Sequence, residues 1–497
     1  MTTRGGVGVV IGTLVCLAFL VGTKWIDHDA VPATGGVGTS GCPGRNPGRT
    51  QSSTVPLVPV PFSCGNNTST PTALCGGSPP ARKHEQKQYA PGIPPAWCPD
   101  YFRHIHTDLE PWRTAGGITR DAVERAQPHA YFRLVVSGGR AYVEKYRDSF
   151  QTRDVLTQWG ILQLLARYPG RVPDVDIMFS TGDMPELRAA DFHDHPDDPP
   201  SSWPPLFRYC KGRTMNLAVL WPDWSFWGWP EVNIRPWAPL LEDIVRENAR
   251  LRWPDREPYA FWKGNPDMAE VRMDLFRCHN GSAGAGKARL FRQDWNAASR
   301  NGFNDSDLAT QCRYRYKIYV EGQSWSASEK YILACDSPML AIDTRFQDFF
   351  SRGLVAGKHY WPIDPANKCR AIDFAVDWGN ANPVRSRWIG EEGSGFTRKE
   401  MDMDHVYEYM LHVLTQYAAL LRYKPTVPEN ALELCPQSMA CSTSGRQREF
   451  MMESRERYVA RYEPCTLPPP FTSQEASHMA ATEQDVRSRL VNMIEAT

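Results

Sequence analysis

The chain has 497 residues, and its 56 lysines and arginines balance 56 aspartates and glutamates. This length suits two ordinary domains or one large two-lobed unit. The balanced charge gives no indication of a nucleic-acid partner or of an acidic disordered tail. Aromatic residues make up 11% of the chain, a content that can line a carbohydrate site but is found more often in a protein core.

The N-terminal segment carries a targeting signal. Residues 5–23 (GGVGVVIGTLVCLAFLVGT) contain no charged side chain, and Arg4 and Lys24 flank them. The run is near the length that a helix needs to cross a bilayer. We therefore predict a short cytoplasmic tail over residues 1–4 and a transmembrane signal-anchor over residues 5–23. A cleaved signal peptide is the alternative, although no small-residue cleavage site directly follows the run.

The cysteines fit a lumenal location for the rest of the chain. There are 13 of them, with no CxxC pair at zinc-finger spacing. Setting aside Cys16, which lies in the predicted anchor, leaves an even number and favours disulfides over metal ligation. Buried free thiols are the alternative for some of them. Triplets for N-glycosylation occur at Asn66, Asn67, Asn280 and Asn304.

Residues 24–96 are rich in glycine, proline, serine and threonine and poor in large apolar residues. Such composition is typical of a flexible linker. Placed after an anchor, it predicts a lumenal stem that holds a folded unit away from the membrane.

A first lobe is predicted from residue 97 to 255, where strand and helix signals alternate. Gly138-Gly139 lies between two short apolar runs, and Pro169-Gly170 ends a stretch with helical spacing. In chain order the signals predict strands at 131–136 and 141–143, a helix at 152–167, strands at 175–179 and 215–221, and a helix at 239–252.

A second lobe is predicted from residue 256 to 400. Its signals are a strand at 260–264, a helix at 268–278, and strands at 316–320 and 339–342 with a helix between them. A long amphipathic helix within residues 401–425 is expected to pack back on the lobes, and residues 426–497 lose periodicity and are expected to form a tail. Alternating strands and helices over two lobes predict an α/β protein with mainly parallel sheets.

The most informative segment is 316–340 (YKIYVEGQSWSASEKYILACDSPML). A strand enters a turn at Gly322, and Ser326 with Glu329 fits a capping box, so a helix should begin near Ser326. Its free backbone N–H groups and the positive end of its dipole would suit a pyrophosphate. The same pattern also describes a strand-turn-helix junction that binds nothing.

This segment resembles the signature of glycosyltransferase family 90, which includes the Rumi-type protein O-glucosyltransferases and capsule-related fungal xylosyltransferases. Further blocks match the family in the same order, and the similarity runs from about residue 97 to 425. These blocks are residues 100–112, 176–183, 224–227 with 230–234, and 262–266 followed by Arg272. Together they are specific, whereas any one alone would be weak.

The resemblance implies a GT-B fold, in which two Rossmann-like lobes face each other across the active site. It also implies transfer of a sugar from UDP-glucose or UDP-xylose to an acceptor hydroxyl, with inversion and without a metal ion or other cofactor. The acceptor stays open between a glycoprotein and a cell-wall or extracellular polysaccharide. A catalytically silent carbohydrate-binding member of the fold is the alternative from another class.

Carried over by position, the resemblance makes Asp183 the general base. An acceptor hydroxyl needs one because it is a poor nucleophile until its proton is removed. Asp183 also follows a predicted strand, where α/β active sites form, although Gly182-Asp183 alone would be an ordinary turn. Arg272 would face the diphosphate and offset the charge of the leaving group, with Arg277 as its near competitor.

The remaining assignments follow from the same resemblance. Donor binding falls to Gly264, Asn265, Arg272, Ser324, Trp325, Ser326, Ala327 and Ser328. Acceptor or sugar contacts fall to Trp227, Glu231 and Asn233, for which buried structural hydrogen bonding is the alternative. We call the serine-rich turn over residues 322–328 the donor turn. Cys312 and Cys335 flank it, match a family disulfide position and would brace it.

Two short motifs could instead suggest a metal ion. Asp174-Val175-Asp176 is a DxD triplet, the metal-binding motif of GT-A transferases, but here it begins a strand instead of following one. His193-Asp194-His195 precedes a proline-rich stretch and fits a polar loop. We expect no metal at either motif.

The chain ends in Ile494-Glu495-Ala496-Thr497, which is not the ER-retention tetrapeptide of many relatives. Together with the predicted anchor, this favours a single-pass type II protein of the Golgi membrane. Residence in the ER lumen, or secretion after signal cleavage, is the alternative.

Overall fold

The computed structural model describes residues 56–64, 75, 96–184, 187, 203–213, 217–280 and 286–496. The chain divides into two compact units, residues 51–483 and residues 1–50 with 484–497, and both large sheets lie in the former. The predicted anchor, Asn66, Asn67 and His193-Asp194-His195 fall outside the described residues. Among the helices that the structure describes, none combines the length and the apolar character needed to cross a membrane.

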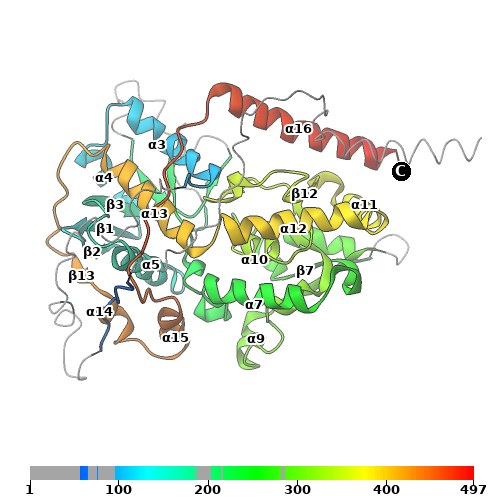
Figure 1. Cartoon of the computed structure of the whole chain (residues 1–497), viewed down its shortest axis with the longest axis horizontal. Coiled ribbons are helices and arrows are strands. Elements are labelled where there is room, and N and C mark those ends of the chain that lie inside the picture. Colours follow the sequence, from blue (N-terminus) through cyan, green and yellow to red (C-terminus); the bar gives the residue numbers. More distant parts are fainter. Residues whose placement is uncertain are drawn as a thin grey trace, which may run out of the picture. The chain divides into compact units, whose positions relative to one another are not determined.

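The first sheet has six strands in the order β13-β2-β1-β3-β4-β6, of which β13, β2, β1 and β3 are labelled in Figure 1. Their bounds are β1 (Phe132–Ser137), β2 (Arg140–Lys145), β3 (Val175–Phe179), β4 (Leu206–Arg208), β6 (Ala218–Leu220) and β13 (Leu432–Leu434). The part formed by β3, β4 and β6 is parallel, whereas β13, β2, β1 and β3 pair antiparallel. The sheet is therefore mixed where mainly parallel strands were expected, because the turn at Gly138-Gly139 closes an antiparallel hairpin.

The second sheet has five parallel strands in the order β12-β10-β9-β7-β8. Their bounds are β7 (Glu257–Gly264), β8 (Ala288–Arg292), β9 (Tyr314–Tyr319), β10 (Met339–Ile342) and β12 (Tyr360–Ile363). The chain begins in β7, moves to the edge at β8, and then builds β9, β10 and β12 on the other side. The direction of winding therefore reverses between β7 and β9, which makes this a topological switch point.

Helices pack on both sheets (Figure 1). The first sheet is contacted by α3 (His104–Thr114), α4 (Arg120–Arg125), α5 (Arg153–Arg167) and α13 (Met403–Ala418). The second is contacted by α10 (Glu329–Leu333), α11 (Lys368–Ala381) and α12 (Pro383–Lys399). Further helices are α7 (Trp237–Arg250), α8 (Glu270–Leu275), α9 (Trp295–Arg300), α14 (Pro436–Ala440), α15 (Gly445–Glu453) and α16 (Ser473–Glu495).

Most of the locally patterned elements are confirmed. The predicted helix at 152–167 is α5, which buries Leu156, Trp159 and Leu162 at helical spacing. The strands predicted at 175–179, 260–264, 316–320 and 339–342 are confirmed as β3, β7, β9 and β10. The mixed order of helices and parallel strands confirms the α/β class.

The DxD triplet is part of the structural framework. Asp176 lies in β3 and accepts from Nε and Nη2 of Arg133 at 2.7 and 2.6 Å, and the Tyr423 hydroxyl donates to it at 2.8 Å. Asp174 accepts from the backbone N–H of Gly138 at 2.8 Å, at the turn of the β1–β2 hairpin. Both carboxylates thus hold the first sheet together.

The segment expected to be a tail is part of the folded unit and contributes a strand to the first sheet. β13 adds to the edge of the first sheet, and α14 and α15 follow it. Residues 56–64 of the expected stem run beside this segment, since the backbone N–H of Val60 donates to the carbonyl of Arg457 at 2.8 Å. Three disulfides join the two regions: Cys64–Cys441, Cys75–Cys435 and Cys98–Cys465.

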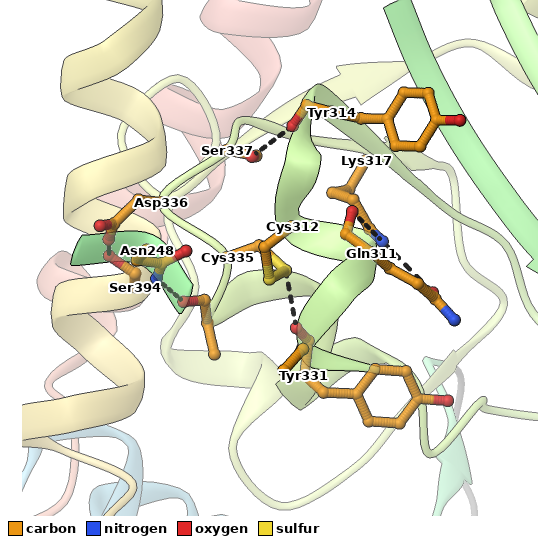
Figure 2. Close-up of a disulfide and its surroundings, with 12 residues drawn as sticks. Asn248, Gln311, Cys312, Tyr314, Lys317, Tyr331, Cys335, Asp336, Ser337 and Ser394 are labelled. Carbon is orange, nitrogen blue, oxygen red and sulfur yellow. Dashed lines mark hydrogen bonds between the residues drawn. A yellow bond between two sulfur atoms is a disulfide. The ribbon is translucent and has the colours of Figure 1, made fainter. Parts of the chain in front are cut away.

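Two further disulfides lie in the second lobe. Cys278 pairs with Cys369, and Cys312 pairs with Cys335 between the start of β9 and the end of α10 (Figure 2). The latter is the pair implied by the family resemblance. Within the described residues Cys210 is a free, buried thiol.

Candidate functional site

The carboxyl ends of β7 and β9 meet at the switch point of the second sheet. β7 runs into Gly264 and Asn265, and β9 runs into Glu321 and Gly322. Arg272, from α8, bridges the two ends: its Nε donates to the carbonyl of Glu321 at 2.7 Å, and its Nη1 donates to that of Asn265 at 3.4 Å. Ligands of open α/β sheets bind at such a position, beyond the carboxyl ends of the strands.

Arg272 also faces the serine-rich turn that follows β9. Its Nη2 donates to Ser326 Oγ at 3.1 Å, and the hydroxyls of Ser326 and Ser328 lie 2.8 Å apart. Burial lowers the pKa of Arg272. Within the described part of the chain, the partners of this guanidinium are two carbonyls and a hydroxyl, and no carboxylate forms an ion pair with it. A partly buried cation without a counter-charge favours an anionic ligand.

The predicted capping box at Ser326 and Glu329 is wrong. The helix α10 begins at Glu329, with Ser328 as its N-cap and no side-chain cap. Ser326 Oγ accepts instead from Arg272 and, at 3.4 Å, from the backbone N–H of Ser328. Glu329 is buried beside Asp348, and burial raises the pKa of its carboxyl well above the usual value. The hydroxyl of Ser326 therefore faces Arg272 and does not cap the helix.

Hydrogen bonds within the turn and from Lys330 hold the rest of the donor turn. The backbone N–H of Gly322 donates to the carbonyl of Ser324 at 3.0 Å, and the carbonyl of Ala327 accepts from Lys330 Nζ at 3.3 Å. Lys330 is buried and forms an ion pair at 3.5 Å with Asp223, which follows β6 in the first lobe. This ion pair connects the donor turn to the first sheet.

Asp183 follows β3 in the first sheet and is half-buried, with 29% of its side chain exposed. Its Oδ1 accepts from Nη1 of Arg153 at 2.7 Å. Its carbonyl accepts from the thiol of Cys210, which follows β4, at 3.5 Å. The carboxylate thus stands at the carboxyl end of a parallel strand, as predicted for an α/β site.

An aromatic cluster brings Asp183 and the donor turn together. The cluster consists of Tyr209, Trp224, Trp229 and Trp325. The ring of Trp325, in the donor turn, lies 5.6 Å from Tyr209 and 6.1 Å from Trp224. Cζ of Arg153 lies 4.4 Å from the centre of the same Trp224 ring. The Asp183–Arg153 pair and the donor turn therefore contact the same cluster of rings.

The three residues expected at the acceptor or sugar have structural roles. Trp227 is fully buried and its indole N–H donates to the Tyr407 hydroxyl at 3.0 Å, so its ring is part of the core. Glu231 accepts from the backbone N–H and the hydroxyl of Thr152, both at 3.0 Å, at the start of α5. Asn233 adopts a left-handed conformation with φ 55°, in the turn between Trp229 and Ile234. The hydrogen bonds of Glu231 are of the structural kind expected as the alternative to an acceptor or sugar contact.

Sequence reasoning missed Arg153, Cys210 and Trp224. Arg153 opens the predicted helix at 152–167, and helix arginines are common, so the sequence offers no signal for it. Trp224 lies in the block 224–227 that matches the family. Within this block the family resemblance pointed to Trp227 instead of Trp224. Cys210 lies next to a stretch without strong periodicity. Among the glycosylation triplets, Asn304 is exposed.

Comparisons with known proteins show the family of this chain. The family model described as Glycosyl transferase family 90 matches residues 94–494. Protein O-glucosyltransferase 1 of Bos taurus is 24% identical over 361 residues, which cover 68% of this chain and 85% of that protein. O-glucosyltransferase rumi of Drosophila melanogaster is 23% identical over 354 residues, which cover 67% of this chain and 80% of that protein. The chain therefore belongs to glycosyl transferase family 90.

Proposed function

We propose that this glycosyltransferase moves glucose or xylose from a UDP-sugar to an acceptor hydroxyl, with inversion at the anomeric carbon. The observation that carries the proposal is that one aromatic cluster contacts both the Arg153–Asp183 pair and the turn whose Ser326 is bound by Arg272. Arg272 offers an unbalanced positive charge at a switch point, where a diphosphate fits. Asp183 offers a half-exposed carboxylate at the end of the neighbouring sheet.

The proposed step is a single displacement. The acceptor oxygen forms a bond to the anomeric carbon while its proton passes to the Asp183 carboxylate. The bond between the anomeric carbon and the diphosphate oxygen breaks, and its electron pair leaves with UDP. Arg272, with the hydroxyls of Ser326 and Ser328, offsets the negative charge that develops on the diphosphate. Gly264 and Asn265 let the backbone approach the nucleotide closely.

No metal ion takes part in the proposed step, since Arg272 would supply the positive charge at the diphosphate. For the acceptor, the name of the relative protein O-glucosyltransferase 1 favours a hydroxyl group of a protein over a polysaccharide. For location, we propose the Golgi membrane, with residues 5–23 as the anchor. Five disulfides support an oxidising compartment.

The test is UDP release by the full chain across a panel of UDP-sugars with EDTA present, compared with Asp183→Asn. We expect release from one donor, insensitivity to EDTA and a loss of at least about 100-fold in the variant. Asp100→Asn is the control, since Asp100 has 84% of its side chain exposed and precedes α3. Absence of both UDP release and UDP binding by calorimetry would contradict the proposal.

A further inference from the structure

We propose that Arg153 is a positioning residue that fixes the orientation of the Asp183 carboxylate. The inference rests on the proposed function, because it presumes that Asp183 accepts the proton of the acceptor. It adds a role for a residue that neither the sequence motifs nor the relatives' names assign.

Arg153 holds the Asp183 loop at two points. Its Nη1 donates to Oδ1 of Asp183 at 2.7 Å and to the carbonyl of Thr181 at 3.2 Å. Only 6% of Arg153 is exposed, so the guanidinium side of the ion pair is shielded from water. A short charge-assisted hydrogen bond of this kind restricts rotation of the carboxylate.

The guanidinium itself is held in place by aromatic rings. Its Cζ lies 4.4 Å from the centre of the Trp224 ring and 5.2 Å from that of Phe150. Both rings restrict the arginine to one orientation, and Trp224 also contacts Trp325 of the donor turn. Trp224 thus contacts both the arginine that holds Asp183 and the donor turn.

The start of α5 is anchored as well. Glu231 accepts two hydrogen bonds from Thr152, directly before Arg153. Gln151 has φ 58° and accepts from the indole N–H of Trp229 at 2.7 Å. These contacts fix the backbone from which Arg153 extends, and they give Glu231 a role in positioning that arginine.

The consequence concerns the two oxygens of Asp183. Oδ1 is occupied by Arg153, so Oδ2 is the oxygen left to accept the proton of the acceptor hydroxyl. A carboxylate that kept its charge but lost this contact could rotate away from the productive geometry. Misplacement of a reacting group by about 1 Å can reduce the rate by about 100-fold.

The test is steady-state kinetics of Arg153→Gln and Arg153→Lys in the full chain. We expect Arg153→Gln to lower kcat by about 100-fold while the KM for the UDP-sugar changes less than about threefold. Arg153→Lys should recover part of kcat, because it keeps a charged donor on the same loop. Unchanged kcat in both variants, or a loss confined to KM, would overturn the proposal.

A double-mutant cycle with Asp183→Glu tests whether Arg153 acts through Asp183. If it does, Arg153→Gln should lower kcat by a clearly smaller factor in the Asp183→Glu background, because the carboxylate is already displaced there. Equal losses in both backgrounds would mean that Arg153 acts independently, and the inference would fail. Should Arg153→Gln not fold, the same cycle is run with Arg153→Lys.

Arg167→Gln is the matched control for losing a buried arginine. Arg167 forms ion pairs with Asp404 and Glu456 at the far end of α5. Its loss should lower the Tm and leave kcat per folded molecule unchanged. If Asp183→Asn kept full activity, the proposed function would lose its base; if that variant were inactive and both Arg153 variants behaved as wild type, the inference alone would fail.

Discussion

At the residue scale, the site depends on a cation whose charge the protein does not balance. Arg272 donates to two backbone carbonyls and to Ser326, and burial lowers its pKa. Neutral partners of this kind fix the direction of a guanidinium but leave its charge available. A diphosphate would provide the missing counter-charge, which is why this residue should govern donor affinity.

Arg272→Gln should weaken UDP binding by about tenfold to a hundredfold, because a charge-assisted hydrogen bond contributes about 1.5–3 kcal/mol. Calorimetry with UDP measures the change directly. Arg277→Gln is the control: Arg277 follows on the same segment, pairs with Asp274 and has 83% of its side chain exposed. Equal loss of affinity in both variants would contradict the role given to Arg272.

At the element scale, the sequence pattern predicted the helices and strands whose formation depends on nearby residues. The helix α5 and the strand β3 match their predictions because both are mainly apolar stretches, and the fold buries most of their residues. The start of α10 did not match, since Ser326 Oγ is held by Arg272, which is 54 residues away in sequence. The family resemblance pointed to Asp183 and Arg272 as candidates, but pairwise contacts such as Arg153 with Asp183 depend on tertiary structure.

An ion-pair cluster joins elements that lie next to the two large sheets. Asp108, in α3, accepts from Nη1 and Nη2 of Arg352 at 2.7 and 2.8 Å, and Lys211 also pairs with it. Arg352 lies between β10 and β12, and Lys211 begins β5 (Lys211–Gly212), which pairs with β11 (Phe346–Gln347). Burial opposes ionisation, but the charges of Arg352 and Lys211 lower the pKa of Asp108 to about 2.

Asp108→Asn should lower the free energy of unfolding by about 3–5 kcal/mol at neutral pH, because it leaves two buried cations unbalanced. The folded-state pKa of Asp108 lies below the usual 3.8, so this stabilisation is present above that pH and is lost as the pH falls through about 2. Denaturant unfolding between pH 7 and 2 measures it. The difference in the free energy of unfolding between wild type and Asp108→Asn should become smaller as the pH approaches 2.

Asp100→Asn is the comparison for this prediction, since Asp100 is exposed and forms at most a weak pair with Arg103 at 4.0 Å. Its unfolding should match that of the wild type at every pH. A difference between wild type and Asp108→Asn that stays constant down to pH 2 would contradict the assignment.

At the scale of the whole molecule, the two ends of the described fold are tied together. The three disulfides that link residues 64–98 with residues 435–465 close loops of more than 350 residues. An even number of cysteines predicts disulfides but not their pairing, because distant partners leave no mark in local sequence. This is why the segments before 97 and after 425 were taken for a stem and a tail.

A chain that ends at residue 425 should fail to fold, because it lacks β13, α14 and α15 and leaves Cys64, Cys75 and Cys98 without partners. A chain that ends at residue 472 keeps all three disulfides and lacks only α16, most of which is exposed. Secretion yield and a cooperative melting transition measure folding. Equal yields of folded protein from the two truncations would contradict this account.

The most direct measurement is the anomeric configuration of the transferred sugar, read by proton NMR from the coupling of its anomeric proton. The account holds that Asp183 deprotonates the acceptor in a single displacement at an α-linked UDP-sugar. It therefore predicts a β-linked product. An α-linked product would contradict a single displacement and, with it, the role of Asp183 as the general base.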